Sequence, residues 1–169
     1  MDDPSVIIEP LSPHHDRKNF SCGEPTLDAY IQRQASQDIR RRVAQVFVSL
    51  GSSGQSIDGY YSLSAASFQK DILPVDMAKR LPHYPVPAAM LGRLAVDRTQ
   101  QGKRLGEILL LDAMRRVSGA SKVIAVHALI VDALNDRAKT FYERYGFIEF
   151  TGNPRRLFLP LETFEKLGF

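Results

Sequence analysis

The sequence predicts an α/β fold in which one mixed β-sheet carries helices on both faces. Residues 43–50 and 57–67 have the composition of two strands, and the turn-rich segment GSSGQS between them indicates an antiparallel hairpin. From residue 88 onward, expected strands alternate with expected helices, which is typical of parallel βαβ units. A hairpin that leads into βαβ units gives a mixed sheet. The length of 169 residues suits one domain, so we expect a single domain over residues 1–169.

The remaining elements follow from hydrophobic spacing and from turn residues. Pro25 to Arg40 is expected to form a helix, because apolar side chains recur there at helical spacing. Lys70 to Pro87 contains four prolines and is expected to form an irregular surface excursion with one short helix near 75–80. Downstream we expect a strand at 88–96, a helix at 105–118, a doubly buried strand at 122–131, a helix at 135–145 ending at Gly146, and strands at 147–150 and 155–159.

Composition places the chain among globular proteins. Hydrophobic residues make up 44% and charged residues 24%, which argues against a disordered or fibrous chain. The single cysteine, Cys22, excludes an intramolecular disulfide framework and a Cys-rich zinc site. The histidine spacings match no zinc motif, so no metal is predicted; we expect His14 and His15 at the surface and His127 in a buried strand. No apolar stretch approaches about 18 residues and the N-terminus is acidic, so we expect a cytoplasmic protein without membrane contact.

Basic residues are clustered, although the formal net charge is only +3. Arg40, Arg41 and Arg42 are consecutive, and Arg155 and Arg156 form a pair. Such clusters attract phosphate-bearing ligands through long-range electrostatics. The alternative interpretation is that they are solvated surface charges.

The segment LGRLAVDRTQQGKRLGEILL, residues 91–110, predicts a strand that runs through a short loop directly into a helix. Free N–H groups and the helix dipole at a helix start favour a phosphate or pyrophosphate, and Lys103 and Arg104 add positive charge. The segment contains neither a Walker loop nor a dinucleotide-binding fingerprint. The alternative is that Gly102 and Gly106 are there for steric reasons alone.

A second informative segment is NDRAKTFYERYGFIEF, residues 135–150. Asn135 is placed to cap the expected helix and to contact a ligand. Phe141, Tyr145 and Phe147 are expected in the core. Tyr142 differs, because a phenol held at the right distance can donate a proton to a leaving thiolate.

Together the two segments resemble the GNAT acetyltransferase superfamily. Its acetyl-CoA loop, Q/R-x-x-G-x-G/A, corresponds to Gln101–Gly106, and its later pattern N-x-x-A-x-x-F-Y-x-x-x-G-F matches residues 135–147 in order and spacing. One departure is Arg104, which stands where the family has its first glycine. We expect Arg104 to adopt an ordinary negative φ and to point outward, because a positive φ would strain a non-glycine residue.

The resemblance implies a GNAT acyltransferase fold with acetyl-CoA as cosubstrate and Tyr142 as general acid. The backbone of the strand before the loop would bond the pantetheine arm and polarise the thioester carbonyl. The implied cofactor-binding residues are Leu94, Ala95, Val96, Gln101, Gly102, Lys103, Arg104, Leu105, Gly106, Asn135 and Lys139.

Further motifs resemble the GNAT toxins of toxin–antitoxin modules. They are Phe20–Tyr30, Gly59–Ser67, Leu91–Asp97 and Pro154–Leu161, so the resemblance covers nearly the whole chain. It implies acetylation of the α-amino group of aminoacyl-tRNA, which stops translation. It also implies a ribbon-helix-helix antitoxin as partner and, as is common in such toxins, a homodimer.

Simple acid–base chemistry agrees with this implied reaction. An ordinary α-amino group has a pKa of about 7.7–8.0, and that of an aminoacyl ester is no higher, so a large fraction is neutral at cellular pH without a strong general base. A tRNA acceptor stem would be held through its phosphates, and the candidates are Arg40, Arg41, Arg42 and Arg93. For Arg93, on a central strand, the alternative is burial beside a carboxylate.

Two other functions remain open. One is a GNAT enzyme that acetylates a small amine, a peptide N-terminus or a lysine; acidic residues would then bind the cationic substrate. The other is a binding module that keeps the fold without catalysis, against which Tyr142 argues because a binder needs no proton donor.

Overall fold

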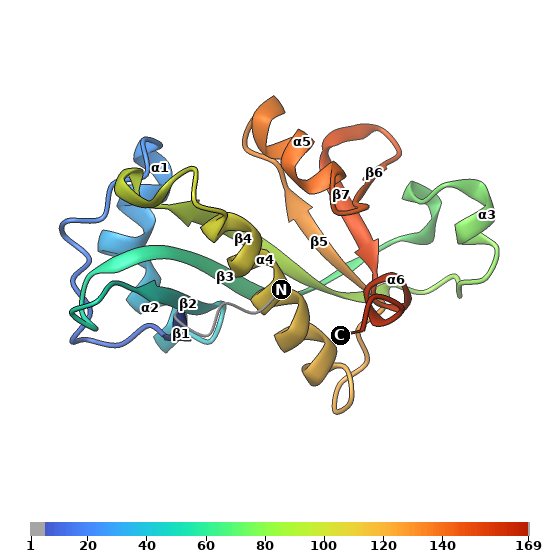
Figure 1. Ribbon diagram of the computed structural model, residues 1–169. Coiled ribbons are helices and arrows are strands. Elements are labelled where there is room, and N and C mark those ends of the chain that lie inside the picture. Colours follow the sequence, from blue (N-terminus) through green and yellow to red (C-terminus); the bar gives the residue numbers. More distant parts are fainter. Residues whose placement is uncertain (1–5, 169) are drawn as a thin grey trace. The chain divides into compact units, whose positions relative to one another are not determined.

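The computed structural model describes residues 6–168, which form a seven-stranded sheet with helices between the strands (Figure 1). Its elements are β1 (Ile7–Pro10), α1 (Pro25–Ala29), η1 (Tyr30–Gln34), α2 (Ala35–Arg40), β2 (Gln45–Leu50), β3 (Ile57–Phe68), η2 (Lys70–Ile72), α3 (Val75–Ala78), β4 (Val86–Val96), η3 (Arg98–Gln100), α4 (Leu105–Ala120), β5 (Ala128–Asp132), α5 (Asp136–Glu143), β6 (Ile148–Phe150), β7 (Asn153–Pro160) and α6 (Leu161–Glu165). The strand order is β1-β2-β3-β4-β5-β7-β6, and β4 and β5 run parallel. The predicted mixed α/β sheet is therefore confirmed.

The chain forms two compact units that share three elements. Among the described residues, unit 1 comprises 6–64 and 93–113, and unit 2 comprises 65–92 and 114–168. The shared elements are β3, β4 and α4, each of which contributes one part to each unit.

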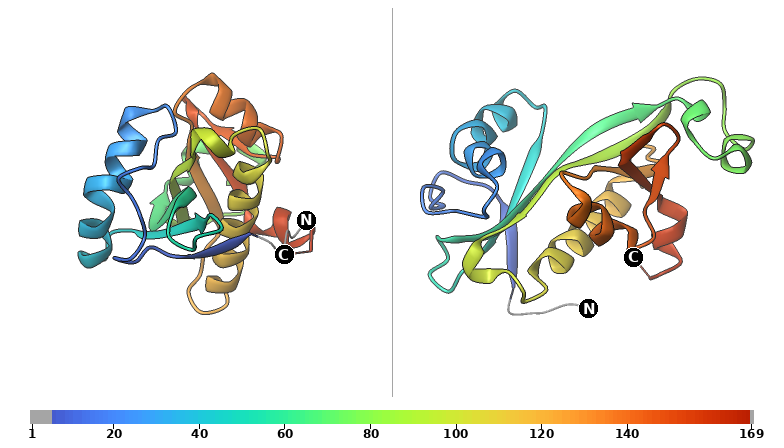
Figure 2. Two further views of the ribbon diagram at one scale, coloured as in Figure 1. Left: turned by 60° about the vertical axis from the view of Figure 1, so that its left-hand side comes forward. Right: turned by 90° about the horizontal axis from the view of Figure 1, so that it is seen from above.

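Unit 1 is an antiparallel β1-β2-β3 arrangement with helices on both faces. The expected hairpin is confirmed, because β2 pairs with β3 from Gln45↔Leu63 to Leu50↔Ile57. Successive β3 side chains point to opposite faces. Tyr60 packs toward α1, where its hydroxyl donates to the Leu27 carbonyl at 2.6 Å, whereas Tyr61 donates to Asp112 of α4. Figure 2 shows α1 and α2 on one side of these strands and the first half of α4 on the other.

Glycine at position 59 lets α4 approach the strands of unit 1 closely. A Cβ atom there would lie 2.8 Å from Leu109 Cδ1 and 3.0 Å from the Ala95 carbonyl oxygen. Leu109 is fully buried, so neither the helix nor the strand has room to retreat.

The first helix is present over the predicted residues but is not uniform. Its middle part, η1, is one turn of π-helix, which begins at the buried Tyr30. A π-turn holds an extra residue and is often found at functional sites. Hydrophobic spacing predicts the helical segment but does not detect such a turn.

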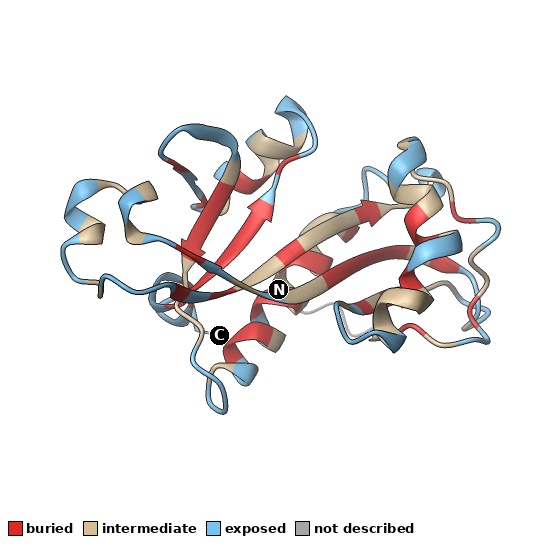
Figure 3. Ribbon diagram, turned by 180° about the vertical axis from the view of Figure 1, so that it is seen from behind, coloured by how far each residue is buried: buried red, intermediate tan, exposed pale blue. Residues whose placement is uncertain are grey.

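Unit 2 is built around β5, which is buried from Ala128 to Val131 (Figure 3). It pairs with β4 over Ala88–Leu91 and with β7 on its other side, and β7 continues to β6. A core of aromatic and aliphatic side chains lies between these strands and the α3 excursion. It includes Phe68, Leu73, Val86, Ala88, Ala128, Ile130, Phe150 and Phe158.

The predicted strand at 122–131 is too long, and its first six residues are wrong. α4 continues to Ala120 and passes into turns, in which the Ile124 amide donates to the Ala120 carbonyl at 3.0 Å. Val123 is 91% exposed and Ile124 is 68% exposed. The continuous apolar run thus combined an exposed turn with the buried strand that follows it.

The helix after β5 agrees with its predicted caps. Asn135 is the N-cap, and its side-chain oxygen accepts from the Ala138 amide at 2.9 Å. Gly146 follows the helix with a φ of 93°, so it supplies the expected C-terminal reversal. Four short elements among the described residues were not predicted, β1, η2, η3 and α6, because three to five residues carry no clear periodicity. No helix in residues 6–168 is long and apolar enough to span a bilayer.

Substitution of Gly59 by alanine is expected to destabilise the protein by about 1–3 kcal/mol, since the added methyl group overpacks the contact between α4 and the strands. Thermal unfolding should show a midpoint lower by at least about 2–4 °C. Gly119→Ala is the matched control, because Gly119 is an exposed α4 residue whose Cβ would meet no atom within 4 Å. That variant should be equal to or more stable than the wild type by up to about 1 kcal/mol. Equal effects of the two substitutions would contradict the close packing.

Candidate functional site

The loop between β4 and α4 is exposed and lies in unit 1. α4 has sixteen residues, and its first turn carries backbone N–H groups without intrahelical partners. Gly102 has a φ of 80° and open space where a Cβ would lie, and Lys103 is exposed beside it. Free amides, a helix dipole and positive side chains suit a phosphate or pyrophosphate. These residues therefore fit the phosphates of a CoA ester.

Arg104 does not adopt the backbone conformation predicted for it. Its φ is 64°, in the left-handed region, and its carbonyl accepts from the Ile108 amide at 3.2 Å to begin α4. The expectation of a negative φ was wrong, because the chain must reverse at this residue to enter the helix. A left-handed conformation at this exposed arginine lowers the free energy of unfolding by about 1–2 kcal/mol.

Three hydrogen bonds fix the same loop to Ser21 and Cys22, and a fourth joins the loop to the end of β4. The Ser21 amide donates to Asp97 Oδ1 at 2.9 Å, and the Arg98 amide donates to the Ser21 carbonyl at 2.8 Å. Gln101 Nε2 donates to the carbonyls of Cys22 and Val96 at 2.9 and 3.0 Å. The Gln101 carboxamide nitrogen is thus used to hold the loop in place.

Asp97 remains ionised in this arrangement. Burial alone would raise its pKa, but the Ser21 amide and both the amide and the hydroxyl of Thr99 donate to the carboxylate, and the pKa is lowered. A carboxyl group with a lowered pKa stabilises the fold above its unfolded-state pKa of about 3.9, and this contribution is lost as the pH falls through the folded-state value.

The end of β4 offers backbone groups. The ladder with β5 covers Ala88–Leu91, so Leu94–Val96 lie beyond it among the described pairings. Ala95 is buried in the core of unit 1, so its side chain faces away from any ligand on the strand edge. The groups of Leu94–Val96 that are placed to bond the pantetheine arm of a CoA ester are therefore their main-chain N–H and C=O groups, not their side chains.

Tyr142 lies in unit 2 with its ring buried between Phe141 and Phe147, at centroid distances of 5.3 and 5.5 Å. No hydrogen bond joins its hydroxyl to another residue in 6–168, yet no side-chain oxygen or nitrogen in that range is buried without a partner. The hydroxyl oxygen is therefore accessible although the ring is not. Burial, and then the charge of Asp132, raise the pKa of Tyr142, so the phenol keeps its proton at neutral pH.

Asn135 and Lys139, two other predicted cofactor residues, also lie in unit 2. The charged side chains around them form ion pairs. Asn135 uses its side-chain oxygen as the α5 cap. Lys139 pairs with Glu149, which occupies its ammonium group. The basic pair noted in the sequence is neutralised in the same way, since Arg155 lies 2.8 Å from Asp136 and Arg156 lies 2.8 Å from Asp132.

The predicted tRNA-binding arginines fall into two settings within unit 1. Arg40, Arg41 and Arg42 are exposed at the end of α2, where Arg42 reverses the chain with a φ of 59°. Arg93 is half-buried on β4, and its guanidinium carbon lies 3.6 Å from the centroid of the Tyr30 ring. The alternative for Arg93, burial beside a carboxylate, holds in part. Hydrogen bonds from Gln34 and Tyr30, and then the charge of Arg93, lower the pKa of Asp38, but within residues 6–168 Arg93 stacks on an aromatic ring and forms no ion pair.

The histidines differ from their predicted settings. His14 is exposed as expected, but His15 is buried, and its Nε2 lies 2.7 Å from Glu9 Oε1. The Ser12 amide donates to His15 Nδ1 at 3.0 Å, which places the proton of a neutral imidazole on Nε2 facing Glu9. Glu9, His14 and His15 lie close enough to share an ion, but this protonation leaves His15 without a free lone pair for one. His127 precedes β5 and is only half-buried.

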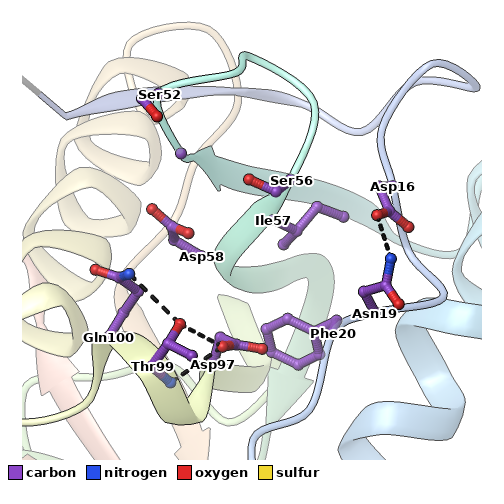
Figure 4. A pocket seen from close by; sticks show the side chains of 11 residues that line it. Asp16, Asn19, Phe20, Ser52, Ser56, Ile57, Asp58, Asp97, Thr99 and Gln100 are labelled. Carbon is purple, nitrogen blue, oxygen red and sulfur yellow. Dashed lines mark hydrogen bonds between the residues drawn. The ribbon is translucent and has the colours of Figure 1, made fainter.

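A polar pocket of about 440 Å³ lies in unit 1 next to the loop, and no sequence motif predicts it (Figure 4). Three carboxylates line it, those of Asp16, Asp58 and Asp97. Burial, and then the charge of Asp97, raise the pKa of Asp58. Such a pocket repels phosphates, so it is separate in chemistry from the basic surface of the loop. Its residues are Asp16, Asn19, Phe20, Gly51, Ser52, Ser56, Ile57, Asp58, Asp97, Thr99 and Gln100.

A strand that passes through a glycine-containing basic loop into a helix suits the phosphates of an acyl-CoA cosubstrate. The acetyltransferase (GNAT) domain profile matches residues 58–149. A tRNA-acetylating toxin of Mycobacterium tuberculosis is 35% identical over 149 residues, which is 88% of each chain. The chain belongs to the GNAT acetyltransferase family.

Solved structures agree over almost the full length. AtaT complexed with acetyl-methionyl-tRNAfMet has a TM-score of 0.90 at 32% identity, covering 97% of this chain and 99% of that one. A mutant AtaT toxin bound to the C-terminus of the antitoxin AtaR and to acetyl-CoA has a TM-score of 0.83 at 30% identity, covering 96% and 98%.

Arg104→Gly is expected to separate stability from cofactor binding. Glycine relieves the left-handed backbone, so the protein should gain up to about 1 kcal/mol. The lost charge should weaken binding of acetyl-CoA by about threefold to tenfold in calorimetric titrations. Arg104→Ala is the matched control: it removes the same charge but keeps the strain, so its affinity should fall without a gain in stability. Identical unfolding midpoints for the two variants would refute the positive φ.

Proposed function

We propose that this protein is an acetyl-CoA-dependent N-acetyltransferase that acetylates the α-amino group of aminoacyl-tRNA and thereby blocks translation, as the toxin of a toxin–antitoxin pair. The observation that carries the proposal is the similarity over nearly the whole chain to proteins named for that reaction. We further propose that residues 1–169 act as one GNAT domain, because a single sheet orders all seven described strands from β1 to β6.

The cofactor residues divide by the kind of contact that they can make. Lys103, Arg104 and the first amides of α4, at Leu105 and Gly106, would bind phosphates. The backbone of Leu94–Val96 would bond the pantetheine arm. Gln101 and Gly102 would shape the loop, and Asn135 and Lys139 would support α5, since their side chains are already engaged.

Tyr142 is the proposed proton donor. Acetyl-CoA supplies an activated acyl group with a thiol as leaving group. The neutral α-amine attacks the thioester carbon, a carbon–nitrogen bond forms and the carbon–sulfur bond breaks. The Tyr142 hydroxyl, which holds its proton at neutral pH, donates that proton to the departing sulfur. The proton that the amine nitrogen loses passes to solvent, and solvent reprotonates the phenolate. No strong base is required of this chain, because a large fraction of the α-amine of an aminoacyl ester is neutral at cellular pH.

Exposed arginines would hold the acceptor. Arg40, Arg41 and Arg42 present positive charge on one helix end, and Arg93 presents a cation on the strand that leads to the cofactor loop. Phosphate contacts of this kind position a nucleic acid and weaken as salt is added.

The proposed partners follow from the same similarity. A relative's structure holds the C-terminus of an antitoxin, and we propose a ribbon-helix-helix antitoxin for this protein, with a homodimer as a possible assembly. The proposed substrate places the protein in the cytoplasm. No metal enters the proposed reaction.

One observation favours a second candidate. The pocket lined by Asp16, Asp58 and Asp97 has the negative charge that a cationic acceptor would need. A GNAT enzyme acting on a small amine, a peptide N-terminus or a lysine would use such a pocket to bind its substrate.

Transfer of labelled acetyl groups from acetyl-CoA decides between the two. We expect label on bulk charged tRNA and none on deacylated tRNA, polyamines or peptides. Tyr142→Phe should reduce turnover by about 100-fold or more while leaving acetyl-CoA affinity nearly unchanged, because only the proton donor is lost.

Tyr145→Phe removes a second phenol from the same helical segment and is the control; its turnover should remain within about threefold of the wild type. Label on an amine or peptide with charged tRNA untouched would leave the GNAT chemistry and exclude the toxin reaction. A Tyr142→Phe variant within about threefold of the wild type would exclude Tyr142 as the acid.

A further inference from the structure

Arg93 has no partner at hydrogen-bond or ion-pair distance among residues 6–168. Its guanidinium carbon lies over the Tyr30 ring, 3.6 Å from the centroid, and the nearby Asp38 carboxylate interacts with it through charge alone. A guanidinium has five N–H donors in a planar fork. Since charged side chains that leave bulk water are normally paired, a half-buried and unpaired arginine points to a ligand that supplies the anion.

Tyr30 is held in place both by a hydrogen bond from its hydroxyl and by ring stacking. Its hydroxyl donates to Asp38 Oδ2 at 3.0 Å, and Gln34 donates to the other oxygen of the same carboxylate at 3.0 Å. Its ring stacks on Tyr60 at 6.2 Å between centroids, and Tyr60 meets Phe20 edge-on at 5.4 Å. The Tyr30 ring over which Arg93 lies is therefore held by its stacking on Tyr60 and by the hydrogen bond of its hydroxyl to Asp38.

Asp38 on the neighbouring helix directs its oxygens to Tyr30 and Gln34, so within residues 6–168 it forms no direct ion pair with Arg93. The hydrogen bonds from Gln34 and Tyr30, and then the charge of Arg93, lower the pKa of Asp38. Burial, and then the hydrogen bond to Asp38, raise the pKa of Tyr30 to about 12 against the opposing charge of Arg93. The phenol is neutral at physiological pH and keeps the proton that it donates to Asp38.

We propose that Tyr30 is a positioning residue that holds the Arg93 guanidinium edge-on for a phosphate of the aminoacyl-tRNA acceptor strand. The inference rests on the proposed function, and it adds Tyr30 to the residues that recognise the acceptor. Arg93 immediately precedes Leu94–Val96, which the proposed function assigns to the cofactor arm. A phosphate bound there would belong to the end of the tRNA nearest the reacting amine. The fork geometry matches two phosphate oxygens, which a lysine cannot reproduce.

Steady-state kinetics with charged tRNA at saturating acetyl-CoA tests the proposal. Tyr30→Leu removes the aromatic face and should raise the KM for charged tRNA by about fivefold to twentyfold, with kcat and the KM for acetyl-CoA changed much less. Tyr30→Phe keeps the face and should recover most of the loss. Arg93→Lys keeps the charge without the fork and should resemble Tyr30→Leu. The double variant Tyr30→Leu/Arg93→Ala should be no worse than Arg93→Ala alone.

Salt dependence supplies a readout that a structural role would not change. If Arg93 contacts one phosphate, the slope of log KM against log salt should fall by about 0.7–0.9 in Arg93→Ala and by less in Tyr30→Leu. This comparison and Arg93→Lys remain decisive if Tyr30→Leu does not fold. Tyr84→Leu, which removes an exposed ring in unit 2, is the control for loss of a tyrosine.

Three results would overturn the proposal. They are an unchanged KM for charged tRNA in Arg93→Ala, equal increases in the KM values of both substrates in Tyr30→Leu, and a salt slope that does not change. If the wild-type protein acetylates charged tRNA and the variants give any of these three results, only the proposed role of Tyr30 is refuted. A wild-type protein that labels no charged tRNA refutes the proposed function itself, and the role of Tyr30 with it.

Discussion

The carboxylate of Asp97 is the group on which the site of unit 1 depends. It accepts from the Ser21 amide and from Thr99, so one side chain both fixes a distant segment and starts the turn after β4. The Ser21 carbonyl returns a bond to the loop, and Gln101 adds two more. These contacts lie at the base of the loop, which leaves Gly102 and the two basic residues after it exposed. The loop is therefore ordered without using the groups that a phosphate needs.

The segment that contains Ser21 also contacts the aromatic residues beneath Arg93, the arginine proposed to bind the acceptor. Phe20, next to Ser21, meets Tyr60 edge-on, and Tyr60 stacks on Tyr30, which carries Arg93. A short segment before α1 thus bears on both the cofactor loop and the arginine. The proposed cofactor loop and Arg93 are thus positioned by the same short segment. Packed rings and backbone hydrogen bonds hold them, and such contacts fix the distance between two substrates better than flexible ion pairs do. In unit 2 the positions are held differently, by ion pairs around α5.

Local rules predicted much of the fold. The hairpin, the β-α-β alternation, the Asn135 cap and the Gly146 reversal each depend on neighbouring residues, and the structure has all of them. The misses depend on contacts that hydrophobic spacing and turn residues do not encode. The left-handed Arg104 is set by the entry into α4, and the burial of His15 by Glu9 on the first strand. Similarly, the sequence pointed to Arg93 as a phosphate contact, but its stacking on Tyr30 requires a strand and a helix far apart in the chain.

Acetyl-CoA binding by Asp97→Ala, measured by calorimetry with amide hydrogen exchange on the same sample, tests the central role of this carboxylate. We expect the Kd to rise by about tenfold or more and the Ser21 and Thr99 amides to exchange faster, because each loses its acceptor. Asp16→Ala is the control, since Asp16 lines the same pocket but its side chain bonds the exposed Asn19. Wild-type affinity in Asp97→Ala, with faster exchange at Ser21, would show that the loop does not depend on this contact and would contradict the account.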